Sequence, residues 1–416
     1  MNSNMPKDSG FDKTLSVLKE GYEFVMNRDR ELDTNIFETR VLGEKTICLT
    51  GSEQAELFYD NTRFRRSDAA PARVKKTLFG EGGVQGLDGD AHKNRKAMFM
   101  SLMDSKAMDE IEDLTEKYWH EFFAEINWND TVELYEAAKV VLLQVACDWV
   151  GVSLEDEDLE TRAGQISDLY ESPAALGIQH WKGRKSRSEA EDWIQGLIEG
   201  VRNGEIEADK DRALYQFAMH KDLDGELLDS QIATVELLNL IRPINAISVW
   251  VAMIGLALHE HPEAAEKLQN ANQEQLEWFI QEVRRYYPFF PVAVARVAVD
   301  FEWQGYEFKE GTLTLLDLYG TNRHPDDWSE PEVFSPERFE GWQQTPFNFI
   351  PQGGGSYDFG HRCAGEFITI VVMRTTLDFL VNHLEFEVPD QDFSFEYNDI
   401  PAVPNDKVKI KPTRLK

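Results

Sequence analysis

An apolar segment of about 32 residues near the middle of the chain places the strongest constraint on the fold. Residues 229–260 carry apolar side chains at spacings of three and four, which predicts one continuous helix. At roughly 1.5 Å per residue such a helix spans nearly 50 Å, so it must cross the core of a large α-helical unit. Asp229 or Ser230 can cap its start, and Pro262 ends it, because proline disfavours helical geometry in the preceding residue.

Arg242 and Pro243 stand side by side within this helix. Proline removes one backbone N–H, frees the carbonyl of Asn239 and is expected to bend the helix, at a cost of roughly 3 kcal/mol. An unpaired buried guanidinium costs far more, so Arg242 must find an anion or water. Two interpretations remain open at this point. Arg242 can reach solvent or a local carboxylate at a tolerated kink, or a ligand binds at the bend.

The remaining pattern predicts a mainly α fold with a smaller β portion. Short strands are expected before about residue 60, in "RVLGEKTICLTG", and again in "VAVARVAVDFEWQGYEFKEGTLTLLDLYG". No linker or repeat interrupts the chain, so residues 1–416 are expected to form a single domain. The other predicted helices are 91–104, 107–126, 132–151, 155–171, 187–203, 210–220, 263–270, 273–286 and 364–383.

The charge balance excludes several classes of partner. The chain has 43 Lys and Arg against 75 Asp and Glu, a net charge of −32, so neither nucleic acid nor an anionic membrane is an expected partner. The N-terminus has no cationic start followed by an apolar stretch, which predicts a cytoplasmic protein without a membrane span. Three distant cysteines argue against a disulfide framework and a four-ligand zinc site.

The stretch "IPQGGGSYDFGHRCAGEF", residues 350–367, is the most informative motif. Its glycines allow close backbone approach, His361 and Arg362 precede Cys363, and a helix is predicted directly afterwards. A thiol at a helix N-terminus beside positive charge is expected to shift toward thiolate, which can act as a nucleophile or a metal ligand. The alternative for an isolated cysteine is a buried structural residue.

Two further motifs accompany it. "QEVRRYYP" places Glu282 and Arg285 three residues apart on one helical face, where they can pair with each other and with Arg338 of "SPERFEG". In this order, E-x-x-R, P-E-R-F and G-H-R-C-A-G-E resemble the haem-thiolate motifs of the cytochrome P450 superfamily. The resemblance implies the cytochrome P450 fold, with haem b between the long helix and the cysteine loop and with Cys363 as axial iron ligand.

One departure from the common superfamily loop narrows the resemblance. Ser356 stands where most members have phenylalanine, seven residues before the cysteine. The form "PQGGG…GHRC" is similar instead to the fatty-acid peroxygenase branch, the bacterial long-chain fatty-acid hydroxylases and decarboxylases. "LFGEGGVQGLDGDAHKNRKAMFMSLM", "GIQHWKGRKSR", "ELLNLIRPINAIS" and "QEVRRYYPF" resemble that branch as well, in order.

This branch gives the Arg242–Pro243 pair a function. Ordinary members carry an acid and an alcohol there to relay protons, and Arg242 and Pro243 replace both. The resemblance implies that Arg242 binds the substrate carboxylate, which then serves as general acid and base for hydrogen peroxide. The expected reaction is hydroxylation of medium- to long-chain fatty acids at the α or β carbon, with some decarboxylation to terminal alkenes and no obligatory redox partner.

Other positions are carried over from the branch one by one. Gln85 matches a haem-side position that the branch fills with Gln or His, and Gln favours hydroxylation over decarboxylation. Arg66, His92 and Lys96 match positions that hold the haem propionates. Phe79 and Phe289 resemble residues that line the substrate channel, although periodicity alone favours ordinary core positions for both.

Two other functions remain open from the sequence. A conventional monooxygenase would receive electrons from redox partners, and the loss of the acid–alcohol pair argues against it. A non-catalytic haem protein that senses or carries a fatty acid or a gas is the second alternative. No DNA-binding or signalling segment in the sequence favours it.

Overall fold

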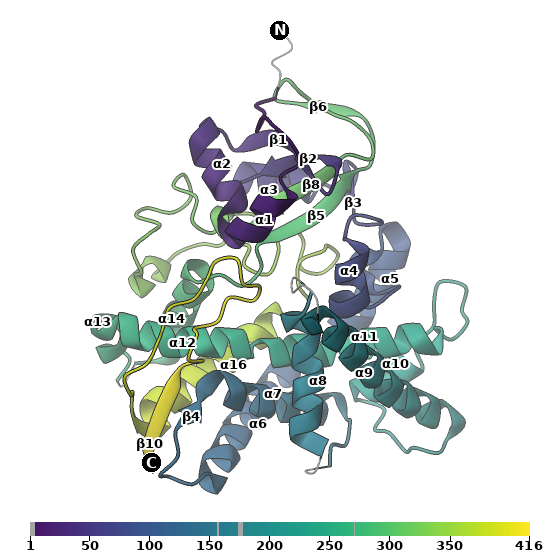
Figure 1. Cartoon of the computed structure of the whole chain (residues 1–416). Coiled ribbons are helices and arrows are strands. Elements are labelled where there is room, and N and C mark those ends of the chain that lie inside the picture. The colour runs from purple at the N-terminus through teal and green to yellow at the C-terminus, as the bar shows by residue number, and fades with distance from the viewer. Residues whose placement is uncertain (1–4, 156–157, 174–177, 270) are drawn as a thin grey trace.

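The computed structural model describes residues 5–155, 158–173, 178–269 and 271–416. The chain is mainly helical with a smaller strand portion, as predicted. Figure 1 shows one end of the molecule (top) formed by the largest sheet and the N-terminal helices α1, α2 and α3. Most of the other helices lie below that sheet and enclose the main hydrophobic core.

The largest sheet has the strand order β1-β2-β8-β5-β3. Strands β2 and β8 are parallel, with Cys48 opposite Leu315, and the other pairs are antiparallel. Both strand regions predicted from the sequence are confirmed. The sheets comprise β1 Ile36–Val41, β2 Glu44–Leu49, β3 Phe64–Arg65, β5 Val292–Val297 and β8 Leu313–Asp317, then β6 Phe301–Trp303 with β7 Tyr306–Phe308, then β4 Val132–Glu133, β9 Leu384–Glu387 and β10 Lys409–Leu415.

Every predicted helix has a counterpart, although several bounds differ. The helix predicted over 187–203 begins at Ile178, and the predicted positions 156–157 and 270 lie outside the described residues. The α-helices outside the long segment are α1 Thr14–Glu20, α2 Phe24–Leu32, α3 Ser52–Phe58, α4 Ala72–Val74, α5 Gly89–Met100, α6 Ser105–Glu125, α7 Leu134–Val150, α8 Leu159–Glu171, α9 Ile178–Asn203, α10 Ala213–Ala218, α13 Pro262–Glu266, α14 Gln273–Tyr286, α15 Leu318–Thr321 and α16 Glu366–Asp378.

The long apolar segment forms two consecutive helices rather than one. These are α11 Ser230–Ala246 and α12 Ser248–Glu260, and Ile247 separates them. The Asp229 side chain caps the start as expected, because it accepts hydrogen bonds from two backbone N–H groups of the first turn. The helix runs through Pro243 without a break. The interruption lies four residues later, where the Ile247 N–H bonds to the Ile244 carbonyl at 3.1 Å in a tightened turn.

Within the described residues, Ser230–Glu260 is the one stretch long and apolar enough to cross a membrane, with a mean hydropathy of 1.6. Of its most apolar window, 89% is buried inside the molecule. In the structure α11 packs against α7, α8 and α9. The segment is therefore the core helix of the fold and not a membrane span.

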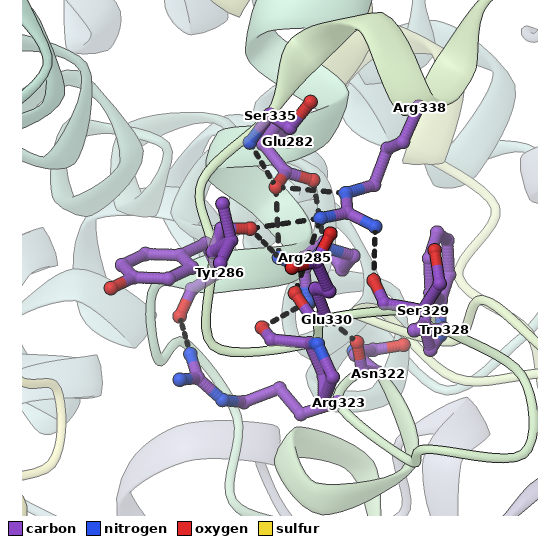
Figure 2. Close-up of polar contacts among 12 residues, drawn as sticks. Glu282, Arg285, Tyr286, Asn322, Arg323, Trp328, Ser329, Glu330, Ser335 and Arg338 are labelled. Atoms are coloured by element: carbon purple, nitrogen blue, oxygen red, sulfur yellow. Dashed lines mark hydrogen bonds and ion pairs between the residues drawn. The ribbon is translucent and has the colours of Figure 1, made fainter.

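The predicted Glu282–Arg285–Arg338 cluster forms as expected and is shown in Figure 2. Arg285 donates to both oxygens of Glu282 at 2.7 and 2.8 Å, and Arg338 Nε donates to Glu282 Oε1 at 3.0 Å. The Glu282 and Arg285 side chains are both 0% exposed. Both arginines also donate to backbone carbonyls between Asn322 and Val333. The cluster thus fastens an irregular segment to α14.

Candidate active site

One cavity of about 380 Å³ collects every site residue predicted from the sequence. Helices α11 and α12 form one wall, and the loop that precedes α16 forms another. Apolar side chains from β5 and its approach, such as Phe290 and Val292, extend the lining. The predicted residues in its wall are Arg66, Phe79, Gln85, His92, Lys96, Arg242, Pro243, Phe289 and Cys363.

The loop before α16 brings Cys363 to the cavity. The Cys363 N–H donates to the Gln352 carbonyl at 3.2 Å, and the Gly360 N–H donates to the Ser356 carbonyl at 3.0 Å. A Cβ on Gly360 would lie 2.5 Å from that carbonyl oxygen, so only glycine fits this turn. The Cys363 residue is partly exposed, and it lines the cavity. Its sulfur is therefore available to a group bound there.

The electrostatic surroundings of Cys363 differ from the expectation. Burial raises the pKa of the Cys363 thiol, and Lys96 opposes that shift. Burial lowers the pKa of His361 far below its usual value, and Arg362 pairs with Glu366 at 2.5 Å. The contributions that lower the Cys363 pKa come from Lys96, the Gly365 backbone N–H and Arg284, and not from the two residues that precede the cysteine. A coordinated metal ion instead supplies the charge that deprotonates a cysteine ligand.

Three basic residues, Arg66, His92 and Lys96, also line the cavity. Arg66 is buried, donates one hydrogen bond to the Phe58 carbonyl at 3.3 Å, and leaves its Nη1 without a partner. Burial lowers the pKa of Arg66 to about 10 and that of His92 to about 4. Lys96 Nζ donates to the Arg362 carbonyl at 2.5 Å. A buried guanidinium with a free N–H suits a carboxylate, so this wall fits the propionate side of a haem.

Arg242 is 5% exposed and forms part of the cavity wall. Nη1 donates to the Leu78 carbonyl at 2.6 Å and Nη2 donates to Asn239 Oδ1 at 3.1 Å, whereas Nε has no partner. Within the part of the chain that the structure describes, no carboxylate lies within ion-pair distance of it. Burial and neighbouring Arg187 lower the pKa of Arg242 to about 9. Arg242 therefore neither reaches solvent nor pairs with a local acid.

The structure adds residues that the sequence reasoning missed. Asn239 Nδ2 donates to Glu236 Oε2 at 3.0 Å and lies 3.4 Å from Gln85 Oε1. Glu236 is completely buried and pairs with Arg95 at 2.7 Å. Asn239 thereby connects Arg242 to a buried ion pair. The segment "VELLNLIRP" indicates this connection, because its polar residues Glu236, Asn239 and Arg242 stand three residues apart on one face of an apolar helix.

The two predicted channel residues lie in the apolar part of the wall. Phe289 stacks on Trp250, with ring centroids 4.7 Å apart. Phe79 ends the short helical turn Lys75–Phe79, whose Leu78 carbonyl receives the Arg242 bond. Gly80 follows with a φ of +82°, and a Cβ there would lie 2.2 Å from the Arg187 side chain. The turn Lys75–Phe79 thus contributes both an apolar side chain to the cavity and a carbonyl to the Arg242 guanidinium.

Comparisons with known proteins agree with this geometry. The family model described as Cytochrome P450 matches residues 16–412. Beta-amyrin 28-monooxygenase of Barbarea vulgaris is 24% identical, over 92% of this chain and 87% of that protein. The structure of cytochrome P450EX alpha (CYP152N1) with myristic acid is 47% identical and covers 99% of both chains with a TM-score of 0.95.

Two further solved structures are similar over nearly the whole chain. A variant of cytochrome P450 OleT in complex with arachidonic acid is 35% identical, covers 100% of this chain and 99% of that one, and has a TM-score of 0.95. Cytochrome P450SP alpha (CYP152B1) with (R)-ibuprophen is 40% identical, covers 97% and 99%, and has a TM-score of 0.95. The resemblance to the superfamily and to its fatty-acid peroxygenase branch is confirmed.

The family implies a haem whose iron is held by a cysteine thiolate. The lining of the cavity, with a sulfur on one loop and unpaired buried cations on another wall, is compatible with such a group. The matched family model spans nearly all of the chain, from residue 16 to residue 412. The chain therefore belongs to the cytochrome P450 family of haem-thiolate oxidoreductases.

Proposed function

We propose that this protein uses hydrogen peroxide to hydroxylate medium- to long-chain fatty acids at the α or β carbon, with some decarboxylation to terminal alkenes. It acts as a single domain, residues 1–416, in the cytoplasm and without an obligatory redox partner. One observation carries the proposal. Arg242 is buried in the wall of a largely apolar cavity, with a free Nε–H and no carboxylate partner among the described residues. A fatty acid supplies both the missing anion and the apolar chain.

The cofactor in this proposal is haem b. Cys363 binds the iron, and Arg66, His92 and Lys96 hold the propionates. The bound haem supplies an iron centre whose thiolate ligand favours cleavage of the peroxide O–O bond. Arg66 is suited to its role because its Nη1 is buried and unpaired. Lys96 is held close to the cysteine loop by its bond to the Arg362 carbonyl.

Arg242 binds the substrate carboxylate through a charge-assisted, bidentate pair, which a buried site strengthens. Pro243 has no side-chain proton to give, and Gln85 is a neutral amide, so neither replaces the missing acid. Arg242 therefore holds the carboxylate where it can accept a proton from peroxide and return it. Because the chain end is fixed there, Cα and Cβ are the carbons nearest the oxidant. The fatty acids bound in the structures of P450EX alpha and of the OleT variant support this substrate class.

The proposal is tested with purified, haem-loaded protein and a series of saturated fatty acids. One reaction contains hydrogen peroxide alone, and the other contains NADPH with a reductase and a ferredoxin. Mass spectrometry of the products should show 2- and 3-hydroxy acids, with some terminal alkene, in the peroxide reaction. Products only in the NADPH reaction would support a conventional monooxygenase. A substrate-induced Soret shift without any product would support a sensor or carrier.

Replacing Arg66 with alanine is expected to weaken haem binding by about 10- to 100-fold, because one charge-assisted contact contributes about 1.5–3 kcal/mol. The rate of haem transfer to apomyoglobin measures this change. Arg63→Ala is the matched control, since Arg63 is 38% exposed, pairs with Asp60 and does not line the cavity. Equal transfer rates for both variants would remove Arg66 from the propionate site.

Replacing Asn239 with alanine is expected to weaken fatty-acid binding by about 5-fold, because Arg242 loses a side-chain acceptor worth about 1 kcal/mol. A spin-state titration with myristic acid measures the dissociation constant. Asn94→Ala is the control, since Asn94, on α5, contacts His220 and does not line the cavity. Unchanged binding in Asn239→Ala would show that Asn239 does not orient Arg242.

A further inference from the structure

The side chain of Gln352 lies beside the sulfur of Cys363. Gln352 Nε2 is 3.9 Å from Cys363 Sγ, a separation compatible with a long hydrogen bond because sulfur is a large acceptor. The same two residues are also joined through the backbone, where the Cys363 N–H donates to the Gln352 carbonyl. Gln352 is therefore the side chain of this loop that can donate directly to the thiolate.

The neighbours of Gln352 determine which end of its amide faces the sulfur. Arg284 Nη2 donates to Gln352 Oε1 at 2.9 Å. A guanidinium has no acceptor, so the oxygen must face Arg284 and the NH₂ group must face the other way. Gln352 Nε2 also donates to Thr369 Oγ1 at 2.9 Å, which leaves its second N–H for the sulfur.

Arg284 and Thr369, which bond to the Gln352 amide, are themselves held by other residues. Arg284 is 1% exposed and pairs with Glu366 at 2.8 Å and with Gln281 at 2.5 Å. The Thr369 hydroxyl donates to the Gly365 carbonyl at 3.2 Å, on the first turn of α16. The cation at the oxygen end of the amide polarises its N–H groups, which makes them stronger donors.

We propose that Gln352, held by Arg284 and Thr369, is a positioning residue that donates a hydrogen bond to the Cys363 thiolate and limits the electron density that the sulfur gives to iron. Hydrogen bonds to a ligating sulfur are a general means of tuning such sites. The Gly365 backbone N–H also hydrogen-bonds to Cys363, and Gln352 adds a side-chain donor that a buried cation holds in place. The inference rests on thiolate ligation and not on the proposed fatty-acid chemistry.

The test compares three variants of the holoprotein, with neither peroxide nor fatty acid present. Gln352→Leu removes the donor and the Arg284 contact. Gln352→Glu keeps the length and the Arg284 contact but has no N–H for the sulfur. Gln281→Leu removes the other glutamine that contacts Arg284 and leaves the sulfur contact intact. Thermal unfolding and the carbon-monoxide spectrum report folding and thiolate ligation in each.

Resonance Raman spectroscopy and redox titration supply the two readouts. Both Gln352 variants should show a higher iron–sulfur stretching frequency and a lower midpoint potential than the unmodified protein, because the sulfur donates more strongly. Gln281→Leu should show neither shift. Unshifted values in both Gln352 variants, or an equal shift in Gln281→Leu, would overturn the proposal. Loss of haem in Gln352→Glu would also overturn it, by assigning Gln352 a purely structural role.

Discussion

Replacing Arg242 with alanine is expected to lower the rate of peroxide-driven fatty-acid hydroxylation by about 10²–10⁴-fold, the range that a positioned acid–base group contributes. The variant loses the cation that binds the substrate carboxylate. That carboxylate is the acid–base group of the proposed mechanism, so it is no longer held in place. Initial rates of 2- and 3-hydroxy acid formation from myristic acid measure the effect. Fatty-acid binding should weaken in the same variant, because the charge-assisted pair is lost.

Arg242→Lys is the companion variant. Lysine keeps the positive charge but cannot form the bidentate contact, so its activity is expected between those of the unmodified protein and the alanine variant. The carbon-monoxide spectrum of each variant reports whether thiolate ligation is intact. Undiminished hydroxylation by a haem-loaded Arg242→Ala protein would contradict the carboxylate site.

The second large effect concerns stability. Replacing Glu282 with alanine is expected to destabilise the fold by about 3–5 kcal/mol, because Arg285 and Arg338 lose their shared buried anion. The Ser335 backbone N–H also loses its acceptor, Glu282 Oε1, at 2.8 Å. Denaturant unfolding followed by tryptophan fluorescence measures the loss.

Glu307→Ala is the control for this prediction. Glu307 is 60% exposed and lies 3.7 Å from Lys309, so its removal should cost less than about 1 kcal/mol. The contrast depends on burial, because both substitutions remove one carboxylate from an ion pair. Equal losses for the two variants would show that the Glu282 cluster does not fasten the segment between Asn322 and Val333.

The sequence predicted the fold class because the long helices are strongly periodic. It did not predict the interruption at Ile247, since neither glycine nor a second proline marks that turn. The bend expected at Pro243 stays a prediction, and α11 is continuous through Pro243, with α7, α8 and α9 packed against this helix. The short helices α1, α2 and α3 were not predicted either. Short segments carry few periodic positions, so tertiary packing determines their conformation.

The sequence predicted which residues line the site, but not which ion pairs they form. The resemblance identified these residues although they lie in widely separated segments of the chain, and the fold brings them into one cavity. The charge around Cys363 differed from the expectation, because a sequence shows that Arg362 precedes the cysteine but not that Glu366 pairs with Arg362. The Arg95–Glu236 pair was missed for the same reason, since its partners lie 141 residues apart.

The most direct test of the account uses one pair of substrates that differ only in the acid group. Haem-loaded protein receives hydrogen peroxide with either myristic acid or its methyl ester, and product formation is followed by mass spectrometry. The ester has the same chain but provides neither an anion for Arg242 nor a carboxyl proton. The account predicts 2- and 3-hydroxy products from the acid and almost none from the ester. Hydroxylation of both substrates at the same positions and rates would contradict it.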